Sequence, residues 1–268
     1  MHLVADERPI ITDTYTAARV AEYVAHAGRA GVAEIGLTDH VYRFAAARDW
    51  MTAPGWVAGA TADLAVYVNA VREAAEAGLP VRLGLEVDWV PGRQADIAGL
   101  RAAHPWDYFL GSYHWMDVHE IDHAANSVWE ATPTETVWRR YVDGFCAAAT
   151  SGLYDSMAHP DLAKVFGHRL DPEPLGLYAE MADAAAAAGV CVEVSTGGLR
   201  KPAAEMYPAP ALLRMFRERG VPVTLGSDAH EPDLIGYRFD AALALLADAG
   251  YRSVTLFRRG ERLQAPLV

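Results

Sequence analysis

Histidines and carboxylates recur at widely separated points of this chain, each time directly after a short apolar run. Imidazole nitrogen and carboxylate oxygen together are ligands of Zn, Mn and Fe, and a site for several divalent ions needs many such groups in one place. A lone His or Asp in such a position is more often a packing residue. Recurrence after five separate runs outweighs that default and indicates a metal centre. The groups are Asp39 with His40, Glu86 with Asp88, His114, His159 with Asp161, and Asp228 with His230.

The apolar runs that precede these groups are typical of strands in a parallel sheet. They alternate with segments of helical periodicity, several of which end in a glycine that favours a left-handed stop. This rhythm predicts a closed barrel or a doubly wound sheet, and in barrels the carboxyl ends of the strands carry the chemistry. The predicted strands are 34–38, 81–87, 108–113, 154–158, 190–194 and 221–226, and the predicted helices are 17–30, 60–77, 93–103, 134–151, 174–188, 209–219 and 240–249.

The composition favours one domain that acts on a small molecule. A length of 268 residues with 52% hydrophobic residues is enough for a single domain, 1–268, with a large core. Lys and Arg number 23 against 35 Asp and Glu, and the formal net charge of −12 disfavours a nucleic-acid partner. Three arginines within 258–262 are interpreted as solvated surface. Neither a signal peptide nor an apolar run of bilayer length is visible, so we expect a cytoplasmic protein without a membrane partner. The oligomeric state stays open.

Two long connections, 50–59 and 115–133, follow strand ends; the first contains Trp, Gly and Pro, and the second contains Trp, Asn and Pro. They are equally compatible with a roof over an active site and with ordinary packed surface loops. Among the histidines outside the main pattern, which are interpreted as structural or solvated, His123 is a candidate for a contact with substrate. Cys146 and Cys191 fit small buried hydrophobes rather than a disulfide.

Taken in order, the motifs resemble those of the PHP (polymerase and histidinol phosphatase) family, and within it the histidinol-phosphatase branch. The resemblance extends nearly from end to end, and the motifs are specific as a set, although each alone would be weak. They are Asp39-His40, Gly84-Leu85-Glu86-Val87-Asp88, Gly111-Ser112-Tyr113-His114, His159-Pro160-Asp161-Leu162, Gly198-Leu199-Arg200-Lys201-Pro202, Tyr207-Pro208 and Ser227-Asp228-Ala229-His230.

The resemblance implies a distorted TIM-like (β/α)7 barrel of the PHP type that holds two or three divalent ions, Zn, Mn or Fe. It also implies the division of the ligands. His2, Glu86 and Asp228 would bind one ion, Glu86 would bridge to a second ion completed by His114 and His159, and His40 and His230 would bind the remaining one. Asp39 would orient His40 or a neighbour through a hydrogen bond.

The chain departs from the family pattern at its beginning. The family opens with a strand that ends in H-x-H, whereas here Met1 stands in the middle position before His2. Either the true start lies upstream, which we favour, or the chain lacks one ligand and a complete first strand. Where relatives carry a further His, this chain has Asp6 and Glu7, which are candidates for a substitute oxygen ligand or for a solvated loop.

The implied activity is hydrolysis of a small phosphate monoester, above all L-histidinol phosphate in histidine biosynthesis. A hydroxide between two ions would attack phosphorus, because coordination brings the pKa of water from ~15.7 to ~7. Glu86, Asp228 and His230 are the predicted catalytic residues, with His230 or a metal-bound water as the proton donor. Arg200, and less strongly Lys164 and Arg43, are predicted to bind phosphate. Two alternatives remain: a PHP phosphoesterase for another small ester or diester, and a metal-binding module without catalysis.

Overall fold

The computed structural model describes residues 1–4, 14–50 and 54–267. At its centre lies a parallel sheet of six strands in the order β1-β2-β3-β6-β7-β8. The strands follow each other in sequence order without the reversal of a doubly wound sheet, so the barrel-type arrangement is the correct one of the two expected. All six predicted strands are present: β1 (Ile35–Leu37), β2 (Val81–Asp88), β3 (Tyr108–Ser112), β6 (Ser156–Met157), β7 (Cys191–Ser195) and β8 (Val223–Gly226).

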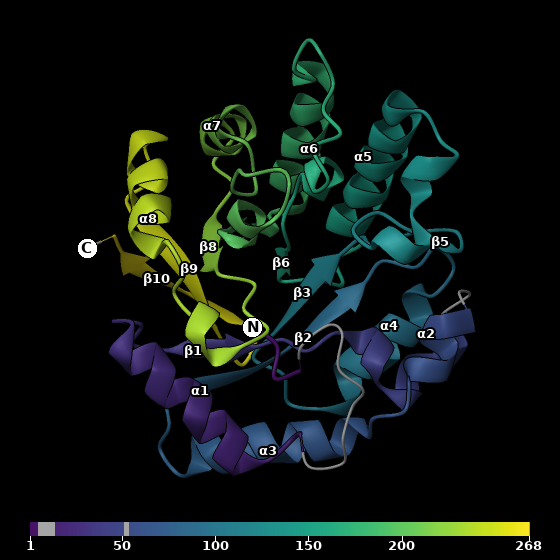
Figure 1. Cartoon of the computed structure of the whole chain (residues 1–268). Coiled ribbons are helices and arrows are strands. Elements are labelled where there is room, and N and C mark those ends of the chain that lie inside the picture. Colours follow the sequence, from purple (N-terminus) through teal and green to yellow (C-terminus); the bar gives the residue numbers. More distant parts are fainter. Residues whose placement is uncertain (5–13, 51–53, 268) are drawn as a thin grey trace.

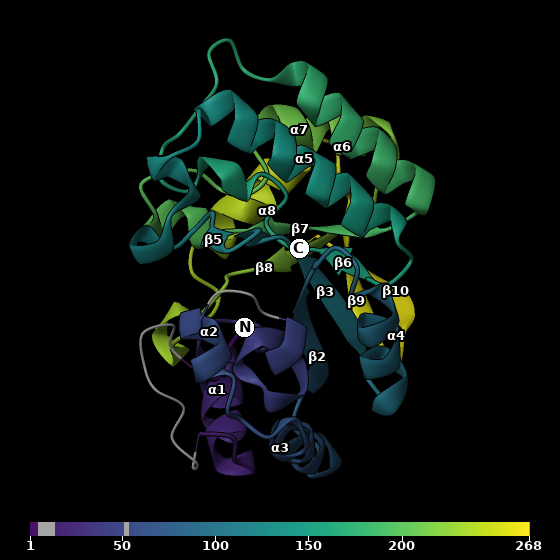
Figure 2. The ribbon, with the colours of Figure 1, turned by 90° about the vertical axis from the view of Figure 1, so that its right-hand side faces the viewer.

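The sheet curls, and helices cover its outer side (Figures 1 and 2). Each long helix follows a strand or precedes the first one, as the glycine-terminated periodic segments predicted. The fold is therefore an α/β half-barrel, and within the described residues the sheet does not reach the seven strands implied by the family resemblance. The helices are α1 (Ala17–Arg29), α2 (Pro54–Gly59), α3 (Leu64–Glu76), α4 (Gln94–Ala103), α5 (Thr134–Thr150), α6 (Leu175–Ala188), α7 (Pro210–Glu218) and α8 (Phe239–Asp248).

The first residues of the chain join the two edges of the curled sheet. The carbonyl of Met1 accepts a hydrogen bond from the Thr38 amide, directly after β1, at 2.8 Å. The amide of His2 donates to the carbonyl of Ala229, shortly after β8, at 2.9 Å. Residues 1–4 thus lie near the middle of Figure 1, at the end of the sheet where the chemistry-bearing side chains follow the strands.

The C-terminal part of the chain forms a hairpin that the sequence did not predict, although Arg258, Arg259 and Arg262 are exposed, as expected. The strands β9 (Ser253–Arg258) and β10 (Glu261–Pro266) form an antiparallel hairpin. Arg262 donates hydrogen bonds to the carbonyls of Gly189 and Asp155, and Arg258 pairs with a glutamate before β1. These arginines attach the hairpin to the sheet. Their partners lie in distant parts of the chain, so the local sequence did not predict these contacts.

Helix α5 lies unusually close to the end of β3. A Cβ atom added to Gly144 would lie 2.2 Å from the ring of Tyr113, so only glycine permits this approach. Tyr113 is the residue before His114 in the sequence, so its packing against α5 fixes the end of β3 that carries this histidine.

Two further expectations concern the whole chain. Cys146 and Cys191 are free thiols, the first half-buried and the second buried, which confirms that they form no disulfide. None of the helices in the described ranges has both the length and the apolar character that a bilayer crossing requires.

Candidate metal centre and active site

The strand ends bring the predicted ligands into one buried cluster. Glu86, at the end of β2, is 2% exposed and lies beside His40, which continues the ladder between β1 and β2. Its Oε1 lies 3.3 Å from Nε2 of His159 and 3.5 Å from Nε2 of His114. Its Oε2 lies 3.4 Å from Nε2 of His2. Each oxygen of this carboxylate therefore faces a different set of imidazoles.

A second part of the cluster lies at the junction of the two sheet edges. The ring of His2 contacts those of His40 and His230, with centroid distances of 4.1 and 4.2 Å, and the latter two rings lie 5.6 Å apart. One ring nitrogen from each of the three lies within 4.8 Å of the others. Asp228 adds an oxygen 3.4 Å from Nε2 of His2. Its neighbour His230 comes from the same loop, so the end of β8 supplies two of the predicted ligands.

These side chains fit divalent cations. The Nε2 atoms of His114 and His159 lie 3.2 Å apart, and those of His40 and His230 lie 3.4 Å apart. Converging nitrogens with adjacent carboxylate oxygens are the donor set of Zn, Mn and Fe sites. Sets of three that could hold an ion are His2, His40 and His230, and His40, Glu86 and His114. All seven predicted metal ligands lie in this cluster.

The surroundings of His2, His40, Glu86 and Asp228 favour the protonation states that bind metal. Burial lowers the pKa of His2 to about 4, and the charge of nearby His230 adds to the effect. Burial, with the neighbouring imidazoles, also lowers the pKa of His40 far below its ordinary value. For Glu86 and Asp228 burial acts in the opposite direction, but the surrounding histidines outweigh it and lower the pKa of both carboxyls. Neutral imidazoles and ionised carboxylates are the forms that coordinate divalent ions. Burial also lowers the pKa of His114 and His159, but neighbouring carboxylates outweigh it and raise the pKa of both.

Two aspartates behind the cluster orient its members. Asp88 is fully buried, and its Oδ1 lies 2.7 Å from Nδ1 of His114, which directs the other ring nitrogen towards Glu86. Burial lowers the pKa of His114, but the charge of Asp88 outweighs it and holds that pKa well above its ordinary value. Asp39 accepts a hydrogen bond from the amide of Leu3 at 2.9 Å and thereby fixes the segment that carries His2.

Two of the six non-glycine residues with positive φ in the described part of the chain lie at these strand ends. Asp228 has a φ of 48° and His159 a φ of 23°, and non-glycine residues in this region cost about 1–3 kcal/mol each. A Cβ atom added to Gly197 would lie 2.9 Å from Oδ2 of Asp228, so a glycine is needed beside this carboxylate. Arg200 donates to the carbonyls of Ser227 and Asp228 at 2.9 and 2.7 Å and holds the strained loop.

A cavity of about 410 Å3 opens over the cluster. The metal-binding candidates that line it are His40, His114, His159, Asp228 and His230. Half of the other twelve lining residues come from the two long connections, since Trp56 belongs to the first and Trp115 and four further residues to the second. Both connections therefore roof the site, as one of the two interpretations predicted. The other lining residues are Tyr42, Glu120, Asp122, His123, Ala124, Leu162, Val165, Phe166, Lys201 and Tyr207.

Comparison with known proteins decides the family. A model of the PHP domain family matches residues 13–197. The chain is also 37% identical to a probable histidinol-phosphatase of Deinococcus radiodurans over 241 residues, which are 89% of this chain and 90% of that protein. The chain belongs to the PHP family. A second relative, a probable histidinol-phosphatase of Clostridium acetobutylicum, is 25% identical over 185 residues, which are 67% of this chain and 72% of that protein.

Solved structures share the PHP fold. Histidinol phosphate phosphatase from Lactococcus lactis, in complex with Zn, L-histidinol and phosphate, matches with a TM-score of 0.78 at 20% identity, covering 98% of this chain and 97% of that one. The putative histidinol phosphatase of Listeria monocytogenes matches with a TM-score of 0.73 at 19% identity, covering 83% and 93%. At these identities the likeness concerns the fold.

The predicted phosphate-binding residue Lys164 has a different role in this PHP chain. It is 1% exposed, and its Nζ lies 2.8 Å from Asp161, 2.7 Å from Glu205 and 2.8 Å from the carbonyl of Met206. These three acceptors match the three protons of the ammonium group. These internal contacts, and the absence of Lys164 from the cavity lining, argue against the predicted phosphate contact.

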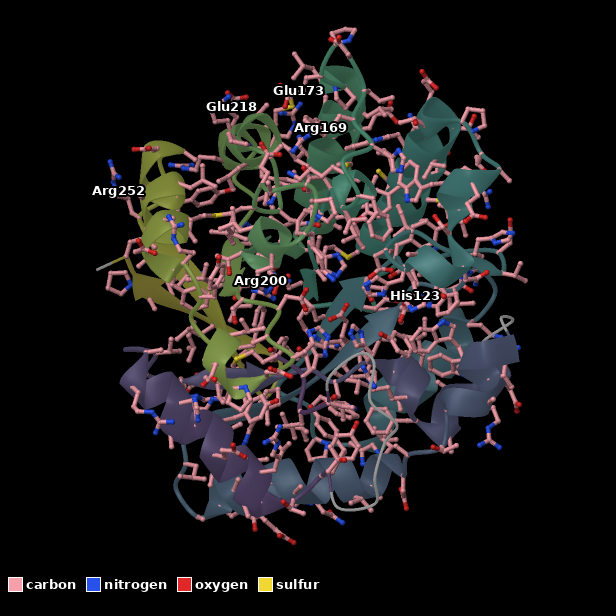
Figure 3. All side chains as sticks on the ribbon, viewed as in Figure 1. His123, Arg169, Glu173, Arg200, Glu218 and Arg252 are labelled. Atoms are coloured by element: carbon pink, nitrogen blue, oxygen red, sulfur yellow. The ribbon has the colours of Figure 1, made fainter. Side chains whose placement is uncertain are left out.

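The two predicted arginines also lie outside the cavity lining. Arg43 is 4% exposed, and its guanidinium lies 5.9 Å from the centre of the Tyr42 ring. Arg43 is not among the residues that line the cavity, and its contact with phosphate stays a prediction. Arg200 uses two of its nitrogens for the backbone around Asp228, and its role towards phosphate stays a prediction. Figure 3 shows nitrogen and oxygen atoms gathered between Arg200 and His123.

Sequence reasoning missed most of the substrate side of the cavity. Lys201 is the only Lys or Arg among the described residues that line it. Lys201 directly follows Arg200 in the sequence, and no local sequence pattern indicates which of these two side chains lines the cavity. His123 does line the cavity, as suspected. For Asp6 and Glu7 no outcome can be given, since they lie outside the described residues.

Proposed function

We propose that this PHP protein is a metal-dependent phosphomonoesterase that hydrolyses L-histidinol phosphate to L-histidinol and phosphate, a step of histidine biosynthesis. The observation that carries the proposal is the buried cluster of His and carboxylate side chains around Glu86, which lies in a chain 37% identical, nearly end to end, to a probable histidinol-phosphatase. The proposed ligands extend from His2 to His230, which supports treating residues 1–268 as one catalytic domain.

Two or three divalent ions, Zn, Mn or Fe, would be held by the seven residues of the cluster. Glu86 is suited to serve two ions because its two oxygens face different imidazoles. When bound, the ions supply Lewis acidity towards the phosphoryl oxygens and make water a nucleophile near neutral pH. Asp88 holds the tautomer of His114, and Asp39 holds the segment of His2. The chain thereby fixes its ligands before any ion arrives.

The substrate's phosphate would contact the cluster and Lys201, which lines the cavity beside it. The proton for the leaving alkoxide would come from a water held by the ions or, where it does not itself coordinate an ion, from His230. Its side chain is 16% exposed, whereas those of His2 and His159 are 1% and 6% exposed. His40, His114 and His159 also line the cavity, but His230 is the most exposed of the four and is therefore the best placed to reach a bound ester.

The cavity suits a small ester better than a polynucleotide. Its lining includes three carboxylates, Glu120, Asp122 and Asp228, and the whole chain carries a formal net charge of −12. A polyanion would be repelled by such a surface, while a single phosphate group can be neutralised locally by the ions and Lys201.

The test is phosphate release from L-histidinol phosphate, compared with a panel of other monoesters and of diesters. The protein is assayed after chelation and again after reloading with Zn, Mn or Fe. We expect metal-restored activity with the highest kcat/KM for L-histidinol phosphate. A preference for a diester would contradict the proposal in favour of a phosphodiesterase, and bound metal without turnover of any ester would indicate a binding module.

A further inference from the structure

The cavity has an acidic and aromatic end that the metal cluster does not use. A line of rings leads to it from the cluster. Tyr42 stacks on His40 with a centroid distance of 4.6 Å, and the Trp56 ring follows at 4.5 Å from Tyr42. Trp115 packs against Trp56 at 5.6 Å. The Nε1 atom of Trp56 then donates to Oε1 of Glu120 at 2.6 Å. The carboxylate of Glu120 is thus separated from the ligand His40 by two aromatic rings.

Two carboxylates at this end lack a cationic partner. Glu120 is 3% exposed, and Asp122 lies two residues further along the same wall. Among the described residues, neither has a Lys or Arg within salt-bridge distance. Burial raises the pKa of Glu120, and the charge of Asp122 raises it further, although the Trp56 hydrogen bond opposes both. A cation bound between the carboxylates would offset the cost of holding them close together in a half-enclosed space.

Buried donors without partners point to a ligand in the same cavity. Trp115 is 7% exposed and Tyr207 is 2% exposed, and both line the cavity. Within the described residues the indole Nε1 of Trp115 and the hydroxyl of Tyr207 have no hydrogen-bond partner. Buried polar groups are nearly always paired, so these donors indicate acceptors that arrive with a bound molecule. The complete cavity thus offers donors and metal ligands to an anion, and carboxylates and ring faces to a cation.

We propose that Glu120 and Asp122, together with the rings of Tyr42, Trp56 and Trp115, bind a protonated amine of the substrate and make the enzyme selective for aminated phosphate monoesters. The inference rests on the proposed phosphatase function, which supplies the phosphate end. An ammonium group gains charge-assisted hydrogen bonds from the two carboxylates and cation–π contact with the rings. A neutral ester of the same size leaves both carboxylates unpaired and binds more weakly.

The experiment measures a ratio of kcat/KM values on a single preparation of metal-loaded, full-length enzyme. The two substrates are L-histidinol phosphate and its deamino analogue, which lacks only the amine. Because both are assayed on the same sample, the ratio does not depend on how much of a variant folds or binds metal. The variants are Asp122→Asn and Glu120→Gln. The control is Asp117→Asn, in the same hairpin region, where the side chain is 79% exposed, pairs with Arg140 and does not line the cavity.

We expect wild-type enzyme to prefer the aminated ester and each of the two variants to reduce the preference by about tenfold to a hundredfold, the range for losing a charge-assisted hydrogen bond. The loss should appear mainly in KM for the aminated ester, and Asp117→Asn should keep the wild-type ratio. An unchanged ratio in Asp122→Asn and Glu120→Gln would overturn the inference while leaving the phosphatase intact. If wild-type enzyme hydrolyses neither ester, the proposed function itself is wrong.

Discussion

The carboxylate of Asp88 lies directly behind the proposed ligand His114 and touches no other proposed ligand in the described part of the chain. Replacing Asp88 by Asn keeps the size of the side chain and an oxygen that can accept from Nδ1 of His114. It removes the negative charge alone. We therefore expect Asp88→Asn to fold, to retain the cluster, and to hold the second metal ion more weakly.

The size of the effect follows from the geometry. The Asp88 oxygen lies 2.7 Å from Nδ1 of His114, and the carboxylate is 0% exposed, so solvent does not screen the contact. A hydrogen bond to a charged group contributes about 1.5–3 kcal/mol, which is roughly a tenfold to 150-fold change in an equilibrium constant. Loss of such a supporting carboxylate typically weakens metal affinity by about 10–100-fold. The two estimates agree, and we expect a loss of about 2 kcal/mol in metal binding.

The assay is competition for Zn between the protein and a chromophoric chelator, followed by kcat/KM measured at saturating Zn. Asp107→Asn is the matched control, because Asp107 also accepts backbone hydrogen bonds beside β3 but lies before the strand instead of at its ligand-bearing end. Asp88→Asn should lose affinity for the weakest-held ion and recover most of its activity when Zn is raised. Equal Zn affinity in wild-type protein and Asp88→Asn would refute the reasoning that His114 is a metal ligand whose ring is oriented by the Asp88 carboxylate.

Four further substitutions test individual assignments. Lys164→Met should lower the free energy of unfolding in urea by about 3–5 kcal/mol, because it leaves Asp161 charged and buried without its partner; a raised KM at normal stability would restore Lys164 as a phosphate ligand. Lys201→Ala should raise KM for the phosphate ester, and an unchanged KM would remove Lys201 from the site. Arg200→Ala should weaken metal retention through the loss of two backbone hydrogen bonds, and a strong rise in KM alone would favour direct phosphate binding instead. Glu205→Gln tests pH dependence: burial raises the pKa of Glu205, but Lys164 outweighs it and holds that pKa below its ordinary value of 4.5. The ionised carboxylate therefore stabilises the fold above that pH, and its contribution is lost as the pH falls. With metal removed by a chelator, the wild-type protein should lose more unfolding free energy than the Gln variant between about pH 5 and pH 3. The same dependence of unfolding free energy on pH in both proteins would contradict the pairing of Glu205 with Lys164.

The fold and the ligand cluster were largely accessible from the sequence, because both depend on local pattern. A strand such as Val81–Asp88 is apolar, apart from Arg82, until the residues that bear ligands, and a glycine follows the helix before it. In a parallel sheet these ends meet on one rim, so a ligand at one end can be assigned to the same site as ligands far away in the chain. All six strands and six of the seven proposed ligands follow from this rule, whereas His2, which precedes every strand, was assigned through the family resemblance.

What the sequence did not reveal depends on partners distant in the chain. Lys164 resembled a phosphate ligand until its contact with Glu205, 41 residues away, came into view. The terminal hairpin was missed because the carbonyls that hold Arg262 belong to Gly189 and Asp155, which no local pattern connects with it. The amine-binding end combines α2, the loop after β1 and the β4 (Trp115–Met116)–β5 (His119–Glu120) hairpin, three segments without a common motif.

The most direct test is anomalous diffraction from crystals of Zn-loaded protein, collected on both sides of the Zn absorption edge. The proposed centre predicts at least two strong peaks a few ångströms apart, about 2.0–2.2 Å from imidazole nitrogens of the cluster and from the carboxylate of Glu86. One peak should lie by His114 and His159, and another by His2 and Asp228. A Zn-saturated crystal in which no peak lies within bonding distance of Glu86 would contradict the metal centre and the phosphatase built on it.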